Sequence, residues 1–111
     1  EKKISKKTIA IISVDIFGQS ENIKEIKRLT KKRKIKIISD TAQAIGSTFN
    51  GKYSGTLTDI GGFSFNYHKH INTGEGGMIV TNSKILAKRC KLIRNHGEAV
   101  IDLNNNNKEK N

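Results

Sequence analysis

The sequence predicts an α/β domain in which a mostly parallel β-sheet is flanked by helices. Two short apolar runs rich in β-branched residues, 8–14 and 35–39, have the length of buried strands. Between them, Ile23, Ile26 and Leu29 recur at the spacing of one helical face. Strand, helix and strand in this order form the βαβ unit that is typical of parallel sheets.

The helix of this unit is predicted from signals at both of its ends. Ser20 can cap its start, and Glu21 in the first turn suits the positive end of the helix dipole. The basic cluster 31–34 falls at its C-terminal end, where cations are favourable.

The second half of the chain is expected to continue the sheet. The segment 46–55 is predicted to be a loop or small hairpin, because its Asn50-Gly51 pair is a turn signal. Segments 61–65 and 78–81 are predicted to be two more strands.

A last helix is expected to follow, capped by Ser83 and ended by Gly97. Three apolar residues share one face of it: Leu86, Cys90 and Ile93. We interpret Cys90 as a core residue, since free cysteines are commonly buried.

Composition limits the possible functions. The formal charge of +11 raises nucleic acid, anionic membranes and phosphorylated ligands as partners. The single cysteine excludes an internal disulfide framework and a zinc site built on paired cysteines. No apolar run reaches the roughly 18 residues of a membrane span.

Three polar residues stand at or just beyond predicted strands, where α/β sheets usually bind ligands: Asp40, Ser64 and Lys69. A lysine near apolar strands can become an amine nucleophile, the anchor that pyridoxal phosphate (PLP) needs. PLP also needs a carboxylate at its pyridine nitrogen and a hydroxyl with backbone amides at its phosphate. Asp40 and Ser64 suit those two roles.

Each of these residues also has an ordinary structural explanation. Asp40 alone is explained more simply as the cap of a turn over 41–44, and Lys69 is one of 17 lysines. His68 and His70 lack an acidic cluster beside them, so solvated or hydrogen-bonded histidines are favoured over a metal site.

The order of the motifs favours the chemical interpretation. Five of them follow one another along the chain: Val14-Asp-Ile-Phe-Gly-Gln19, Ser39-Asp-Thr-Ala-Gln-Ala-Ile-Gly46, Asp59-Ile-Gly-Gly-Phe-Ser-Phe65, the segment 69–77 and Arg94-Asn-His-Gly97. Together they closely resemble the DegT/DnrJ/EryC1/StrS family over residues 8–97. Those proteins are PLP-dependent aminotransferases of nucleotide-linked keto sugars, with the fold type I (aspartate aminotransferase-like) architecture.

The resemblance implies roles for four residues. Lys69, five residues after Ser64, falls where the family's lysine bonds covalently to PLP and then moves protons between cofactor and substrate. Asp40 would pair with the pyridine nitrogen, Gln43 would contact the ring hydroxyl side, and Ser64 would hydrogen-bond the phosphate. Some relatives are dehydratases with histidine in place of this lysine, so Lys69 favours transamination over dehydration.

The resemblance also implies a biological setting. The parent protein would transfer an amino group from glutamate or glutamine to a nucleotide-linked keto-deoxy sugar, for amino-sugar or cell-surface polysaccharide biosynthesis. It would be a cytoplasmic homodimer. Family members are much longer, so residues 1–97 are expected to be an internal fragment of the PLP-binding large domain, inactive alone. The Asn- and Lys-rich residues 98–111 are expected to be a poorly ordered tail or a truncated continuation.

Two other hypotheses remain. A basic module could grip nucleic-acid phosphates through its lysines, but the four arginines, 5% aromatic residues and interspersed acids disfavour it. A non-catalytic relative could keep the fold alone. The presence of Asp40, Gln43, Ser64 and Lys69 argues against that alternative.

Overall fold

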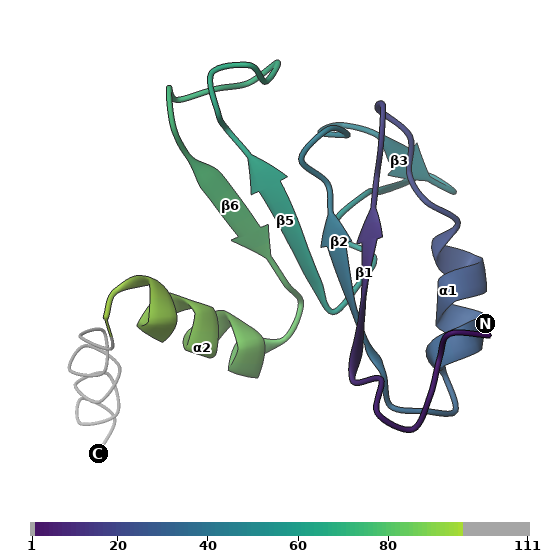
Figure 1. Ribbon diagram of the computed structural model, residues 1–111. Helices are drawn as coiled ribbons and strands as arrows, with labels where there is room; N and C mark the ends of the chain where they lie inside the picture. Colours follow the sequence, from purple (N-terminus) through teal and green to yellow (C-terminus); the bar gives the residue numbers. More distant parts are fainter. Residues whose placement is uncertain (1, 97–111) are drawn as a thin grey trace.

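The computed structural model describes residues 2–96 and contains a four-stranded sheet in the order β1-β2-β5-β6 (Figure 1). Its strands are β1 (Ala10–Val14), β2 (Lys36–Asp40), β5 (Ile60–Ser64) and β6 (Gly77–Val80). β1, β2 and β5 run parallel, and β6 is antiparallel to β5. The mostly parallel sheet is therefore confirmed, with strand bounds within two residues of those predicted.

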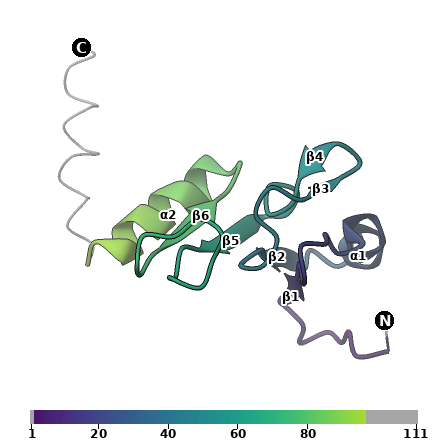
Figure 2. The same cartoon turned by 90° about the horizontal axis from the view of Figure 1, so that it is seen from above.

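The two faces of this sheet differ in what they bury. Ser13, Ile37 and Ser39 are buried on the face beside which α1 (Ile23–Thr30) lies in both views (Figures 1 and 2). On the opposite face, Ile12 is 68% and Val14 48% exposed. Because paired residues share a face, Val14, Asp40 and Gly62 lie side by side on this open face.

The start of α1 differs from the prediction. The helix begins after Asn22, whose side chain accepts a hydrogen bond from the Glu25 N–H at 3.2 Å. Ser20 is not the cap: its hydroxyl donates to the Glu21 carbonyl oxygen instead. Glu21 precedes the helix, because its carboxylate is bound by serines of the sheet. The basic cluster 31–34 lies at the other end, beginning with the C-cap Lys31.

The predicted hairpin is present as β3 (Thr48–Phe49) and β4 (Lys52–Tyr53). Its turn residues, Asn50 and Gly51, have φ angles of 51° and 75°, the left-handed values that two-residue hairpins require. The prediction from the Asn-Gly pair is thus confirmed.

The last helix, α2 (Lys84–Arg94), is capped as expected by Ser83, which accepts from the Leu86 N–H at 3.3 Å. The prediction that Cys90 belongs to the core is wrong. It is half-buried, and α2 has no buried residue, because the helix lies on the β6 side of the sheet (Figures 1 and 2). Gly97 and residues 98–111 lie outside the described residues. Neither α1 nor α2, the helices of residues 2–96, is long and apolar enough to cross a membrane.

Adding a methyl group at Gly61 is expected to destabilise the fold. A Cβ there would overlap the backbone carbonyl of Gly55, so Gly61→Ala should lower the free energy of unfolding by about 1–3 kcal/mol. Gly62→Ala is the matched control, because the nearest atom to its Cβ would be the Ser39 oxygen at 3.8 Å. Urea denaturation measures both variants, and equal midpoints for the two would contradict the prediction.

Candidate active site

The carboxyl ends of the parallel strands bring the predicted site residues to one edge of the sheet. Asp40 ends β2 and Ser64 ends β5. Gly77, the first residue of the antiparallel β6, pairs with Ser64 at the same edge. Lys69 lies on the connection between β5 (Ile60–Ser64) and β6 (Gly77–Val80). Figure 1 shows this connection at the top of the sheet.

A hollow of about 400 Å³ lies at this edge of the sheet. Three of the four predicted site residues line it: Gln43, Ser64 and Lys69. It is also lined by Phe17, Gly18, Ala42, Ile45, His68 and His70. Asp40 lines an adjoining hollow of about 900 Å³ between β5, β6 and α2. The two hollows share Ala42 and Ser64, so Asp40 lies next to the other three without sharing their hollow.

The Asp40 carboxylate also stabilises the turn that follows it. Its Oδ1 accepts from the Ala42 N–H at 3.1 Å, and the Ala44 N–H donates to the Thr41 carbonyl. The ordinary explanation of Asp40 as a capping residue therefore applies to this structure. The residue stays exposed, so the capping role is compatible with ligand binding.

Gln43 is oriented by the turn after β1. Its Oε1 accepts from the Phe17 N–H at 3.3 Å, and its carbonyl oxygen accepts from the Gly18 N–H at 3.0 Å. Phe17 and Gly18 have φ angles of 54° and 75°, so this turn is strained at Phe17, a non-glycine residue. Both amide groups of the turn thereby point toward Gln43.

The connection that carries Lys69 is closed by hydrogen bonds across its base. The Lys69 N–H donates to the Asn66 carbonyl at 2.9 Å, and Asn66 Nδ2 donates to Glu75 Oε1 at 2.8 Å. The Thr73 hydroxyl donates to the Glu75 carbonyl at 2.9 Å. Glu75 therefore ties the end of the loop to its start, a role that the sequence did not reveal.

The histidines at this edge have no metal-binding arrangement around them. Within residues 2–96, no group of three or more His, Cys, Asp or Glu residues could hold a metal ion. His68 lines the hollow beside Lys69, and its ring lies 3.8 Å from the Tyr67 ring, tilted by 36°.

Sequence analysis also missed the buried polar residues behind Asp40. Asp15 is 1% exposed and follows β1, one residue beyond the Val14–Asp40 pair, so it lies level with Thr41, the residue after β2. Its Oδ2 accepts from the Thr41 hydroxyl at 2.7 Å. The position of Asp15 just after an apolar strand was the available signal, but a single polar residue there is common.

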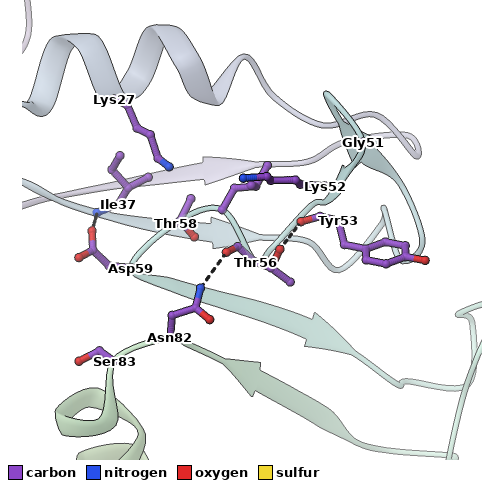
Figure 3. Close-up of a pocket in the computed structure, with 11 residues that line it drawn as sticks. Lys27, Ile37, Gly51, Lys52, Tyr53, Thr56, Thr58, Asp59, Asn82 and Ser83 are labelled. Atoms are coloured by element: carbon purple, nitrogen blue, oxygen red, sulfur yellow. Dashed lines mark hydrogen bonds between the residues drawn. The ribbon is translucent and has the colours of Figure 1, made fainter.

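A third hollow, of about 890 Å³, lies at the opposite edge of the sheet (Figure 3). Lys27 of α1 and Lys52 of β4 are among the residues that line it. Asp59 accepts from Lys36 Nζ at 2.7 Å and from the Ile37 N–H at 3.0 Å. None of the predicted site residues lines this hollow.

A family model tests the resemblance that the five motifs suggested. The model of the DegT/DnrJ/EryC1/StrS aminotransferase family matches residues 1–110. The chain belongs to this family. The resemblance drawn from the five motifs is thereby confirmed.

Relatives within the DegT/DnrJ/EryC1/StrS family are named for amino-sugar synthesis. The chain is 47% identical over 100 residues to the GDP-perosamine synthase of Escherichia coli O157:H7, covering 90% of this chain and 28% of the relative. It is 40% identical over 97 residues to the UDP-4-amino-4,6-dideoxy-N-acetyl-beta-L-altrosamine transaminase of Helicobacter pylori, covering 87% and 26%. The chain thus spans about a quarter of the length of these curated relatives.

Solved structures of the family share the fold. Helicobacter pylori PseC, an aminotransferase of pseudaminic acid biosynthesis, matches with a TM-score of 0.83 and 40% identity, over 86% of this chain and 26% of that one. A GDP-4-keto-6-deoxymannose-3-dehydratase with a trapped PLP-glutamate geminal diamine matches with a TM-score of 0.82 and 37% identity, over 88% and 25%. The expected α/β architecture of PLP-dependent transferases is confirmed.

The Lys36–Asp59 ion pair is expected to make stability depend on pH. Burial, the largest single influence, raises the pKa of Asp59, but hydrogen bonds from Lys36 and the Ile37 N–H, with nearby lysine charges, outweigh it and lower the pKa. A lowered carboxyl pKa stabilises the fold above the unfolded value, about 3.9 for Asp, and this contribution is lost as the pH falls through the folded pKa.

We therefore expect Asp59→Asn to lower the free energy of unfolding by about 0.5–1 kcal/mol at neutral pH, since the pair is partly exposed. The difference from the unmodified protein should shrink as the pH falls below about 4. Denaturation curves across the acid range measure it, and a constant difference at all pH values would contradict the assignment.

Proposed function

We propose that the whole protein containing this chain is a PLP-dependent aminotransferase of nucleotide-linked sugars. One observation carries the proposal: Lys69, Gln43 and Ser64 line one hollow, with Asp40 beside it, at the edge where parallel sheets bind ligands. Membership in the family supplies the chemistry to which this arrangement is suited.

The residues at this edge fit PLP by their chemistry. An amine, a carboxylate, a hydroxyl and an amide match the aldehyde, ring nitrogen, phosphate and ring hydroxyl of the cofactor. The hollow's volume of about 400 Å³ lies in the range of small-ligand sites. When bound, PLP supplies an electron sink for the electrons released as a proton leaves the amino-bearing carbon.

Lys69 is proposed to anchor the cofactor through Nζ and to carry the proton. When its amine is not bonded to the cofactor, Nζ could act as a general base and accept the proton from the amino-bearing carbon. It could then act as a general acid and donate this proton to the cofactor. The Asn66 and Glu75 hydrogen bonds at the base of the loop limit where Nζ can reach.

Asp40 and Ser64 are proposed to hold the two ends of the cofactor. A carboxylate at Asp40 favours a proton on the ring nitrogen, because opposite charges stabilise each other. Ser64 Oγ accepts from the Asn66 N–H at 3.3 Å, which leaves the hydroxyl proton to be donated to a phosphate oxygen. Gln43, fixed through its Oε1 by Phe17, has Nε2 to donate to the ring hydroxyl.

The substrates are proposed from the relatives. A nucleotide-linked keto-deoxy sugar would accept the amino group, as the names of the perosamine synthase and the altrosamine transaminase suggest. Glutamate or glutamine would donate it; the PLP-glutamate adduct of one relative supports glutamate. Some relatives are dehydratases, but a lysine at position 69 favours transamination.

The same proposal covers the setting of the enzyme. Residues 1–97 form part of the PLP-binding large domain, and the protein acts as a cytoplasmic homodimer in amino-sugar or polysaccharide biosynthesis. The 111 residues alone are proposed to be inactive. The exposure of Ile12 and Val14 on the sheet supports this, since apolar faces of parallel sheets are normally covered.

Lys69 is expected to be the residue that PLP modifies. Borohydride reduction of the whole protein with PLP, followed by peptide mass spectrometry, should place a pyridoxyl group on Lys69. Lys69→Ala should abolish the adduct, whereas Lys52→Ala, in the hollow at the opposite edge, should retain it. A folded protein with an unmodified Lys69 would overturn the proposed function.

Replacing Asp40 by asparagine is expected to slow catalysis while the fold is retained. Asn keeps the side-chain oxygen that accepts from Ala42 but removes the charge that favours protonation of the ring nitrogen. We expect kcat to fall about 10²–10³-fold, the usual loss when a group that stabilises developing charge is removed. Steady-state kinetics and thermal melting of Asp40→Asn test this; a kcat equal to that of the unmodified enzyme would exclude the role.

A further inference from the structure

We propose that Asp15 and Glu21 share one proton at neutral pH, and that this buried carboxyl pair positions Asp40. The inference rests on the proposed function, because Asp40 is the residue assigned to the cofactor's ring nitrogen. Asp15 and Glu21 act through Thr41 and the backbone, so they are positioning residues.

The geometry begins with Asp15, which is almost entirely buried. Its two carboxylate oxygens have separate donors: Oδ2 accepts from the Thr41 hydroxyl at 2.7 Å, and Oδ1 accepts from the Glu21 N–H at 3.0 Å. Two good donors stabilise a charged carboxylate in a buried place. Both carboxyl oxygens of Asp15 are therefore held in place by donors from the elements on either side of it.

Glu21 has a different environment. Its Oε1 accepts from the Ser13 hydroxyl at 2.7 Å and from the Ser39 hydroxyl at 3.4 Å. Its Oε2 is buried and has no hydrogen-bond partner among the described residues. A buried charged oxygen without a partner is costly, whereas a protonated Oε2 becomes a donor that needs only a nearby acceptor.

The geometry points to the Asp15 carboxylate as this acceptor, because its Oδ1 already lies 3.0 Å from the Glu21 backbone nitrogen. Burial raises the pKa of Glu21 most strongly, and a hydrogen bond with the Asp15 carboxyl and the charge of Asp15 raise it further, against the lowering effect of Ser13. Among the described residues, Asp15 is the charged group found to act on the Glu21 carboxyl. Asp40, on the neighbouring strand, has its side chain on the opposite face of the sheet. The groups found to shift the pKa of Glu21 include no cation that would stabilise a negative charge on its carboxyl group.

Asp15 contacts the chain at the Asp40 carbonyl and again at the next residue, Thr41. The Asp15 N–H donates to the Asp40 carbonyl oxygen at 2.9 Å. The next residue, Thr41, is held through its side chain by Asp15 and through its N–H by the Gly62 carbonyl at 2.8 Å. These bonds fix the backbone on which the Asp40 carboxylate stands, so loosening Thr41 should reduce the precision of the contact with the ring nitrogen.

The shared proton can be seen directly by infrared spectroscopy. A free glutamate is ionised at neutral pH, because its pKa is about 4.3. The whole protein should nevertheless show the C=O band of a neutral carboxylic acid at pH 7, and Glu21→Gln should remove this band. Absence of the band from the folded, unmodified protein would overturn the proposal, and this result does not depend on cofactor binding.

The positioning role is tested by PLP affinity, measured by absorbance titration. Thr41→Val removes the hydroxyl at nearly constant shape and should weaken PLP binding about tenfold, the scale of one hydrogen bond to a charged group. Thr41→Ser keeps the hydroxyl and should restore the affinity. Similarly, Glu21→Gln supplies a permanent N–H donor toward Asp15 and should bind PLP more tightly than Glu21→Leu.

The possible results separate this inference from the proposed function. If the unmodified protein binds PLP and Thr41→Val binds it equally well, the positioning role is wrong and the function stands. If the unmodified, folded protein binds no PLP, the proposed function fails, while the infrared band still decides whether the proton is shared. If Thr41→Val does not fold, the two Glu21 variants decide the role: equal PLP affinities of Glu21→Gln and Glu21→Leu would overturn it.

Discussion

The in-register pairing of β1, β2 and β5 is the constraint on which the rest of the structure depends. The hydrogen-bond ladder continues one residue beyond the strands, where the Asp15 N–H binds the Asp40 carbonyl and the Thr41 N–H binds the Gly62 carbonyl. Because these strands run parallel, the residues after each strand end lie at one level and at one edge. A slip of one residue would move Asp40 to the opposite face of the sheet.

The sequence allowed prediction of those features that depend on neighbouring residues along the chain. The hairpin followed from Asn50-Gly51, because this pair adopts positive φ values readily, and the start of α2 followed from Ser83, whose hydroxyl caps locally. The cap of α1 was misassigned because Glu21 is bound by Ser13, a partner eight residues away that only the fold brings near. The prediction that Cys90 is buried was wrong for the same reason, because its burial depends on where α2 lies in the fold.

In the candidate site, too, some residues could be predicted from the sequence and others depended on the fold. Asp40, Ser64 and Lys69 could be proposed from strand ends and motif order, because the carboxyl edge of a parallel sheet is a general ligand position. The supporting residues could not be proposed. Asp15 and Glu75 act through hydrogen bonds to Thr41 and Asn66, and no local pattern distinguishes such carboxylates from ordinary surface acids.

The distribution of polarity across the sheet links stability to the site. Near the carboxyl edge, the face beside α1 buries Ser13, Asp15, Ser39 and Thr41, while apolar Ile12 on the opposite face is exposed. Buried polar clusters stabilise a fold less well than apolar packing of the same volume, yet fully bonded ones fix a single geometry. The positioning of Asp40 proposed above would account for a cluster of this kind directly behind that residue. The apolar open face, in contrast, has the composition of a surface that the rest of a larger domain would cover.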